Sequence, residues 1–144
     1  MNWFNYYGLA VIILIMIPNV IYAMRHKNIE LGAYTNKIVI IGEQIGRYGS
    51  MIFMVINIPY TYFGFWFHHA LIVYLSVNGG LCIAYLMFWI IYRNKNGKTG
   101  ALSLSVTPSC IFIFCGIVTA SIPLLICAVL FAVSHVTISY KNAP

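Results

Sequence analysis

The chain has 144 residues, of which 62% are hydrophobic and only 7% are charged. About a quarter of the residues of a soluble domain are charged, so this composition excludes an ordinary soluble domain and indicates a membrane protein with four or five spans of about 20 residues. The formal net charge of +6 comes mainly from basic residues in short connectors. We therefore attribute it to the positive-inside rule and expect no nucleic-acid partner.

We predict an all-α fold, a polytopic transmembrane helix bundle that forms a single integral membrane domain over residues 1–144. The first span covers about 4–24 and begins without the positively charged segment of a signal peptide, so we expect it to be retained. Pro18 should kink this span and free a backbone carbonyl near Asn19. A basic connector then leads to the second span, at about 38–58.

The third span, at about 67–92, follows an uncharged aromatic connector and precedes a second basic one. As one helix, residues 101–140 would be about 60 Å long, twice the thickness of the hydrocarbon layer. Two spans at about 102–118 and 122–140 fit better, with Ser121 capping the second of them. The alternative is four spans, with a long kinked last helix.

The basic connectors predict how the chain is oriented. With five spans and an outside N-terminus, every connector that holds Lys or Arg lies inside, and the outer connectors hold none. This pattern predicts that the C-terminus lies on the inner, cytoplasmic side of the membrane. Four spans would place the C-terminus and Lys141 outside.

The second span contains an acid and a base. Glu43 and Arg47 are four residues apart and therefore share one face of a helix. A charge at membrane depth costs on the order of 2.5–3.5 kcal/mol and is usually paired. Gly42, Gly46 and Ser50 have the small-xxx-small spacing that lets another helix approach closely. Two interpretations stay open: a site for a substrate, ion or proton, or a structural ion pair that fixes the helix packing.

Further polar side chains fall at similar depths. At about 1.5 Å per residue, Asn78 lies near the level of Arg47, and His135 lies in the cytoplasmic half. His135 would be either a proton relay with Glu43 or a structural hydrogen-bonding group. Tyr48 would either bond a ligand or fill the bundle interior. The candidate ligand- or ion-binding residues are Glu43, Arg47, Gln44, Tyr48, Asn78, His135 and Asn19.

Sequence motifs of metal and catalytic sites do not occur in the chain. The four cysteines form no CxxC, and the adjacent His68 and His69 point to different sides of a helix. There is also no HExxH, GxSxG or glycine-rich phosphate loop. We therefore predict no metal site and no cofactor, and we assign no catalytic residue.

Three motifs are spread over most of the chain: Ile-Pro-Asn-Val-Ile-Tyr-Ala at 17–23, Glu-Gln-Ile-Gly-Arg-Tyr-Gly at 43–49 and Ser-His-Val-Thr-Ile-Ser-Tyr at 134–140. In these motifs the chain resembles a group of small, uncharacterised polytopic membrane proteins of Gram-positive bacteria. No activity is assigned to the group, so the resemblance implies no catalytic or binding residue.

The leading functional hypothesis is a transport, permeation or membrane-complex subunit with a Glu43–Arg47 polar site open to the cytoplasmic side. We expect contact with membrane lipids, and a homo-oligomer or a partner membrane subunit, because so short a chain encloses little volume. The alternative is a membrane-embedded enzyme acting on lipid or isoprenoid substrates, with Glu43 and His135 as acid–base groups and Arg47 as an anion clamp. A third hypothesis is a structural or regulatory protein without a ligand.

Overall fold

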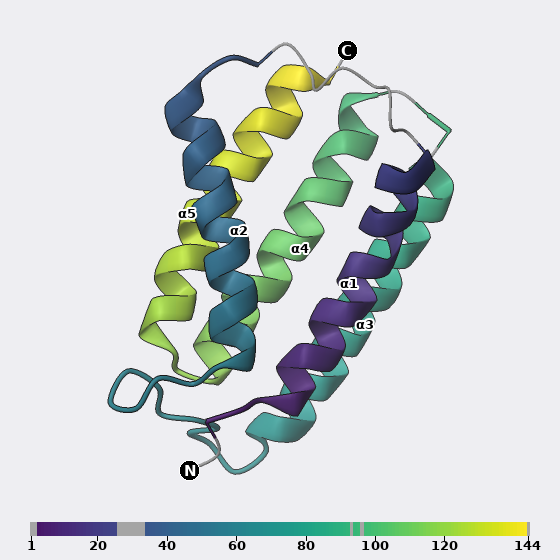
Figure 1. The fold of residues 1–144 in the computed structure, drawn as a ribbon. Helices are drawn as coiled ribbons and strands as arrows, with labels where there is room; N and C mark the ends of the chain where they lie inside the picture. The colour runs from purple at the N-terminus through teal and green to yellow at the C-terminus, as the bar shows by residue number, and fades with distance from the viewer. Residues whose placement is uncertain (1–2, 26–33, 93, 96, 144) are drawn as a thin grey trace.

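The computed structural model describes residues 3–25, 34–92, 94–95 and 97–143, and these residues form five α-helices and no strand (Figure 1). The helices are α1 (Tyr6–Arg25), α2 (Lys37–Val55), α3 (Ala70–Tyr92), α4 (Lys98–Val118) and α5 (Ile122–Asn142). The all-α bundle is therefore confirmed. The alternative with one long last helix is wrong, because the chain reverses between α4 and α5.

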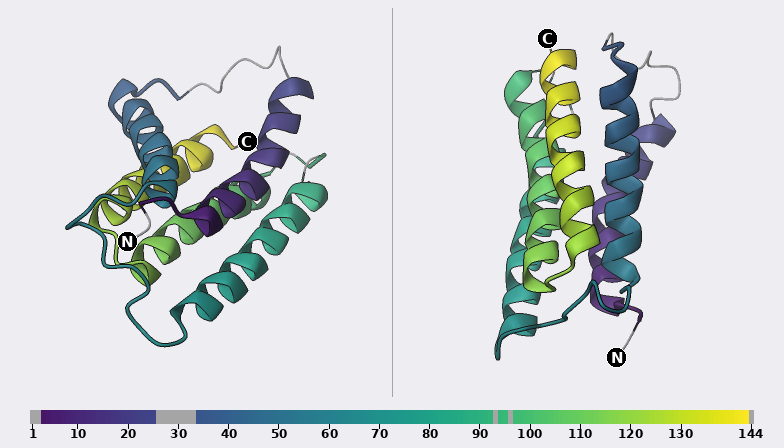
Figure 2. Two further views of the ribbon diagram at one scale, coloured as in Figure 1. Left: turned by 60° about the horizontal axis from the view of Figure 1, so that its bottom comes forward. Right: turned by 90° about the vertical axis from the view of Figure 1, so that its left-hand side faces the viewer.

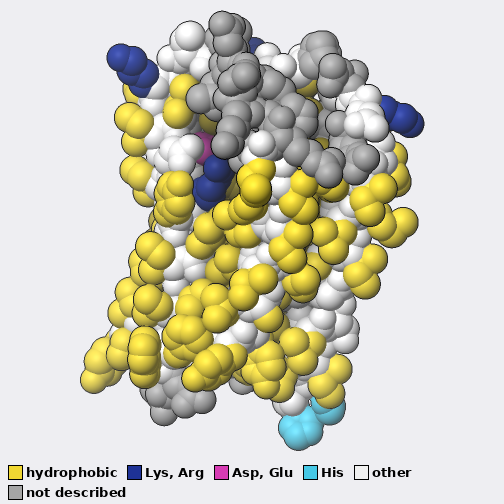
Figure 3. Space-filling view, turned by 45° about the vertical axis from the view of Figure 1, so that its right-hand side comes forward, with side chains coloured by type: hydrophobic (Ala, Val, Ile, Leu, Met, Phe, Trp, Pro, Cys, Tyr) yellow, Lys and Arg dark blue, Asp and Glu magenta, His cyan; other side chains and the backbone are white. Residues whose placement is uncertain are grey.

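Four of the helices, α2 to α5, are long and apolar enough to cross a membrane. In α1 the apolar stretch is shorter, over Tyr6–Tyr22. Large hydrophobic side chains are exposed on the flanks, for example Ile38, Ile72 and Ile126, and Figure 3 shows one such flank. A flank of this kind suits a bilayer, where lipid tails replace water against the apolar side chains.

The helices pack in an order that differs from their order in the chain. Helix α5 packs against both α2 and α4. Helix α4 also packs against α3, and α1 packs against α3 (Figures 1 and 2). Helices α1 and α2 meet at Gly8, where an added Cβ atom would lie 2.0 Å from the Met54 carbonyl oxygen. From that contact the two helices diverge toward their other ends (Figure 2).

The bundle has two different ends. The basic end is defined by Lys37, Lys98 and Lys141, which lie where α2 and α4 begin and α5 ends. The aromatic end is formed by the connector 56–69 and the turn 119–121, neither of which contains Lys or Arg. The first and last described residues lie at opposite ends (Figure 1), as an odd number of passages requires.

Backbone hydrogen bonds join the segments of the aromatic end. The Asn5 amide donates to the Val55 carbonyl at 2.7 Å, and the Asn57 amide donates to the Trp3 carbonyl at 2.8 Å. The turn between α4 and α5 is tied to the connector as well, because the Ile122 amide donates to a connector carbonyl at 3.1 Å. These bonds satisfy backbone groups that would otherwise be costly near a membrane.

Small residues of α2 let α5 approach closely. A Cβ atom on Gly46 would lie 2.5 Å from the Phe131 backbone nitrogen, and one on Gly42 would lie 3.1 Å from the Ser134 hydroxyl oxygen. Ser50 is fully buried. The predicted small-residue contact is confirmed, and its partner is α5.

The cap of α5 differs from the prediction. Ser121 occupies the N-cap position, but its side chain makes no capping hydrogen bond, so the predicted side-chain cap is wrong. Its backbone amide instead donates to the Gly116 carbonyl at 3.0 Å, which closes the tight turn after α4. Helix α2 does have a side-chain cap, because the Asn36 amide oxygen accepts from the Ile38 amide at 3.1 Å.

Candidate functional site

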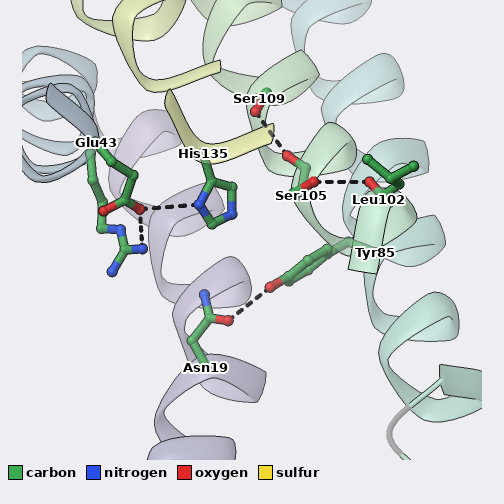
Figure 4. Close-up of polar contacts among 8 residues, drawn as sticks. Asn19, Glu43, Tyr85, Leu102, Ser105, Ser109 and His135 are labelled. Atoms are coloured by element: carbon green, nitrogen blue, oxygen red, sulfur yellow. Dashed lines mark hydrogen bonds and ion pairs between the residues drawn. The ribbon is translucent and has the colours of Figure 1, made fainter. Parts of the chain in front are cut away.

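Glu43 lies at the centre of a cluster of three ionisable side chains. Its side chain is only 4% exposed. The Arg47 guanidinium, one turn along α2, donates to Glu43 Oε1, so the predicted intrahelical ion pair is present. His135 Nδ1, from α5, lies 3.1 Å from the same oxygen. Figure 4 shows Glu43 and His135 facing one another from the two helices.

The sequence explains why these groups meet. Helices α2 and α5 are antiparallel, and Glu43 and His135 lie six and seven residues, or about 9 and about 10.5 Å at about 1.5 Å per residue, from the basic end of their helices. The glycines of α2 let the two backbones come close enough for a short carboxylate to reach the imidazole. The His135 ring stacks on Phe131 at 4.6 Å between centroids, and Phe131 in turn meets Phe112 edge-on at 5.4 Å. The aromatic contacts hold the imidazole in its orientation.

The hydrogen-bonding pattern assigns the protons of the cluster. Arg47 stabilises Glu43 as a carboxylate, and a carboxylate has acceptors only. The His135 Nδ1 atom must therefore donate to Glu43. In the neutral imidazole this leaves the Nε2 lone pair to accept a proton, so His135 can take up or release a proton without breaking its bond to Glu43.

Exposure differs among the three side chains. Glu43 is buried, whereas the Arg47 side chain is 36% exposed and the His135 side chain 23%. A guanidinium has five N–H donors, and the bond to Glu43 uses one of them. On the flank seen in Figure 3, a basic side chain lies beside an acidic one among hydrophobic side chains. The cluster can therefore present both an anion-binding group and a proton-accepting group at the side of the bundle.

A second polar pair joins α1 to α3 near the cluster. The Tyr85 hydroxyl donates to Asn19 Oδ1 at 2.9 Å (Figure 4). Asn19 Nδ2 donates to the Ile15 carbonyl at 3.3 Å. The predicted candidate Asn19 therefore bonds Tyr85 of α3 and the backbone of its own helix rather than Glu43, Arg47 or His135.

The other predicted candidates lie elsewhere. Gln44 and Tyr48 are exposed on the outer face of α2, where Tyr48 is 59% exposed. Asn78 is buried, but its hydrogen-bond partner is Cys115, whose thiol donates to the Asn78 amide oxygen at 3.4 Å. The structure therefore brings together Glu43, Arg47 and His135 and leaves these three candidates outside the cluster.

Sequence reasoning did not identify Tyr85 or Phe131. Tyr85 lies three and seven residues after two other buried polar residues of α3, Cys82 and Asn78, and this spacing was a usable signal. Phe131 gave no such signal, because an aromatic residue in an apolar span has no property that marks it as the support of a histidine.

Comparisons with protein-family models, with curated proteins and with solved structures found no match for this chain. The resemblance to small membrane proteins of Gram-positive bacteria therefore stays a prediction. The functional conclusion has to rest on the geometry of the cluster.

Proposed function

We propose that this protein is a small membrane transport or permeation subunit in which the Glu43–Arg47–His135 cluster moves protons. The supporting observation is that buried Glu43 bonds both Arg47 and a titratable imidazole from another helix, at 3.1 Å. An ion pair needed only to fix helix packing would be complete with Glu43 and Arg47. The added imidazole gives the site a second nitrogen that can accept a proton while Nδ1 keeps its bond to Glu43.

The proposal extends to topology and partners. Lys37, Lys98 and Lys141 share the end of the bundle nearer the cluster, which supports a cytoplasmic location for that end by the positive-inside rule. We accordingly propose a bacterial cytoplasmic membrane, an outside N-terminus and an inside C-terminus. A second copy of the chain or another membrane subunit would supply the remaining wall of a pathway, and lipids would surround the apolar flanks.

Proton flux into liposomes tests the proposal. The purified protein is reconstituted with a trapped pH-sensitive dye, and a potassium gradient with valinomycin sets the membrane potential. We expect flux from the wild-type protein and loss of flux from Glu43→Gln and His135→Gln, which roughly keep the size of the side chains and remove the carboxylate and the imidazole. Tyr48→Phe, on the exposed face of α2, is the matched control and should conduct normally. Equal flux from wild type and both variants, or none from any, would refute the proposal.

One observation favours a second function, a membrane enzyme acting on lipid or isoprenoid substrates. Glu43 and His135 lie within the hydrogen-bond distance required of an acid–base pair, and Arg47 has donors left for an anionic headgroup. Incubation with labelled phospholipids or isoprenyl phosphates, followed by mass spectrometry, separates the two functions. An enzyme would release product in detergent micelles, where no flux can exist, and would lose turnover in His135→Gln.

A further inference from the structure

Helices α1 and α2 touch near the aromatic end and diverge toward the basic end (Figure 2). Their contact is at Gly8, which meets the Met54 carbonyl. At 3.6 residues per turn, Asn19 lies three turns from Gly8 on the same face of α1. Arg47 lies two turns from Met54 on the same face of α2. Asn19 and Arg47 are therefore on the facing surfaces of the two helices, at the end where these surfaces separate.

Exposure shows that the space between these surfaces is open. Asn19 is exposed and the Arg47 side chain is 36% exposed, although each lies on the face turned to the neighbouring helix. Glu43 and Asn19 lie at the same level, because each is six residues from the basic end of its helix. The opening therefore reaches the ion pair of Glu43 and Arg47. Figure 3 shows a basic and an acidic side chain beside one another at the surface of this flank.

The opening is polar toward the basic end and hydrophobic toward the middle of the bundle. Ile12 and Met51 lie about one turn from the Gly8–Met54 contact, on the side of Asn19 and Arg47, and both are partly buried hydrophobic residues. A polar level followed by a hydrophobic one matches an amphiphile, whose headgroup lies toward the basic end and whose acyl chain lies deeper. A free inorganic anion would match the polar level alone.

Charge selects an anionic headgroup. Among the residues that the structure describes, Glu43 is the only acid, whereas Lys37, Lys98 and Lys141 share the basic half with Arg47. The bond to Glu43 uses one of the five N–H donors of the guanidinium. A guanidinium matches the geometry of a phosphate, and basic pockets between transmembrane helices bind anionic lipid headgroups.

Asn19 supplies a second donor from the opposite wall of the opening. Its Oδ1 atom accepts from the Tyr85 hydroxyl at 2.9 Å, which orients the amide with its nitrogen turned away from Tyr85 (Figure 4). The nitrogen donates one N–H to the Ile15 carbonyl at 3.3 Å and has a second N–H. A phosphate between the two walls can accept from this amide and from Arg47.

We propose that an anionic phospholipid binds between α1 and α2, with its phosphate on Arg47 and Asn19 and an acyl chain along the hydrophobic part of the opening. This binding goes beyond the function proposed above and does not require that the cluster move protons. The phosphate gives Arg47 an anionic partner on its exposed side, where a charge at membrane depth is otherwise costly.

Lipid-dependent unfolding in detergent micelles tests the proposal. The delipidated full-length protein is unfolded thermally with phosphatidylglycerol, phosphatidylcholine or inorganic phosphate, added at equal phosphate concentration. We expect phosphatidylglycerol to raise Tm by about 5–10 °C when its concentration is about 100 times its Kd. Phosphatidylcholine has no net charge and inorganic phosphate has no acyl chain, so each should raise Tm much less. An equal rise with either of them would overturn the assignment to an anionic lipid.

Variants of the two walls locate the site. Arg47→Met should abolish the rise in Tm, measured against the same variant without lipid, whereas Lys37→Met removes an exposed charge and should keep the rise. Asn19→Leu should weaken the apparent affinity about tenfold or more, because a hydrogen bond to a charged group is lost. Gln44→Leu removes an exposed amide from the outer face of α2 and should bind normally. No rise with phosphatidylglycerol, an unchanged rise in Arg47→Met, or an unchanged affinity in Asn19→Leu would overturn the proposal.

Discussion

Removal of Arg47 tests whether the Glu43 ion pair is a coupled unit. The Arg47→Met variant leaves the Glu43 carboxylate, 4% exposed, with His135 as its hydrogen-bonding partner. Breaking a buried ion pair by removing one partner costs about 3–5 kcal/mol. Because Arg47 itself is 36% exposed, water already screens part of the attraction, and we take the lower end, about 3 kcal/mol.

The Glu43→Gln variant should cost less. The amide keeps the shape of the carboxyl group and one acceptor oxygen, and Arg47 can extend its charge toward water. The Arg47 guanidinium then bonds a neutral acceptor instead of a carboxylate, and the bond to His135 loses its charged acceptor, a loss of about 1–2 kcal/mol. In the double variant both charges leave together, so we expect a total loss of about 1–2 kcal/mol, well below the sum of the single variants.

Thermal unfolding followed by circular dichroism in detergent micelles measures this cycle. At about 2–4 °C per kcal/mol, Arg47→Met should lower Tm by about 6–12 °C and the double variant by about one third to two thirds of that. Lys37→Met removes the same charge from an exposed position at the start of α2 and should change Tm little. If the loss in the double variant equals the sum of the single losses, Glu43 and Arg47 are not coupled and the account of the cluster is wrong.

Three further predictions follow from close approaches and burial. Gly46→Ala should lower the free energy of unfolding by about 1–3 kcal/mol, because the added Cβ atom would lie 2.5 Å from an α5 backbone nitrogen. Gly79→Ala is the control: the space around Gly79 is open, so this variant should not lower stability in the same unfolding assay. Gly49→Cys should form a disulfide with Cys127 under mild oxidation, because the two Cβ atoms would lie 3.3 Å apart. The cross-link is detected by gel mobility, and Gly79→Cys is the control that should not react with Cys127. Burial raises the pKa of the Tyr62 phenol in the connector. The unfolded chain therefore loses this proton first, so stability should begin to fall as pH rises past about 10, and Tyr62→Phe should remove that part of the fall.

Each of these predictions has a contrary result. Equal stability of Gly46→Ala and wild type would mean that α2 and α5 are farther apart than described. Failure of the Gly49→Cys variant to cross-link would contradict the same contact by an independent route. A Tyr62 phenol that ionises at its usual pH in an ultraviolet titration would mean that the connector is open to water.

Much of the fold could be predicted from the sequence. Helix lengths follow from apolar runs matched to the bilayer, and the turn before Pro123 was visible because one helix over 101–140 would be too long to fit. The pairing of Glu43 with Arg47 followed from their spacing alone. The approach of another helix to Gly46 followed from its small neighbours, although nothing local identified α5 as that helix.

The rest of the site could not be predicted, for a geometric reason. Residue counts give the depth of a side chain along a helix, and this placed His135 near Glu43 correctly. They do not give the rotation of each helix about its axis. Gln44 and Tyr48 have suitable depth but point outward, and Asn78 points at Cys115 of α4. Which face turns inward is decided by packing over the whole bundle.

The hydrogen bonds at the aromatic end have a mechanical consequence. They fasten the start of α1 to the end of α2, through Asn5 and Val55, at the place where these helices touch. Toward the basic end the same two helices spread apart (Figure 2). A displacement of α2 relative to α1 would therefore be smallest at the fastened end and larger at the level of Glu43.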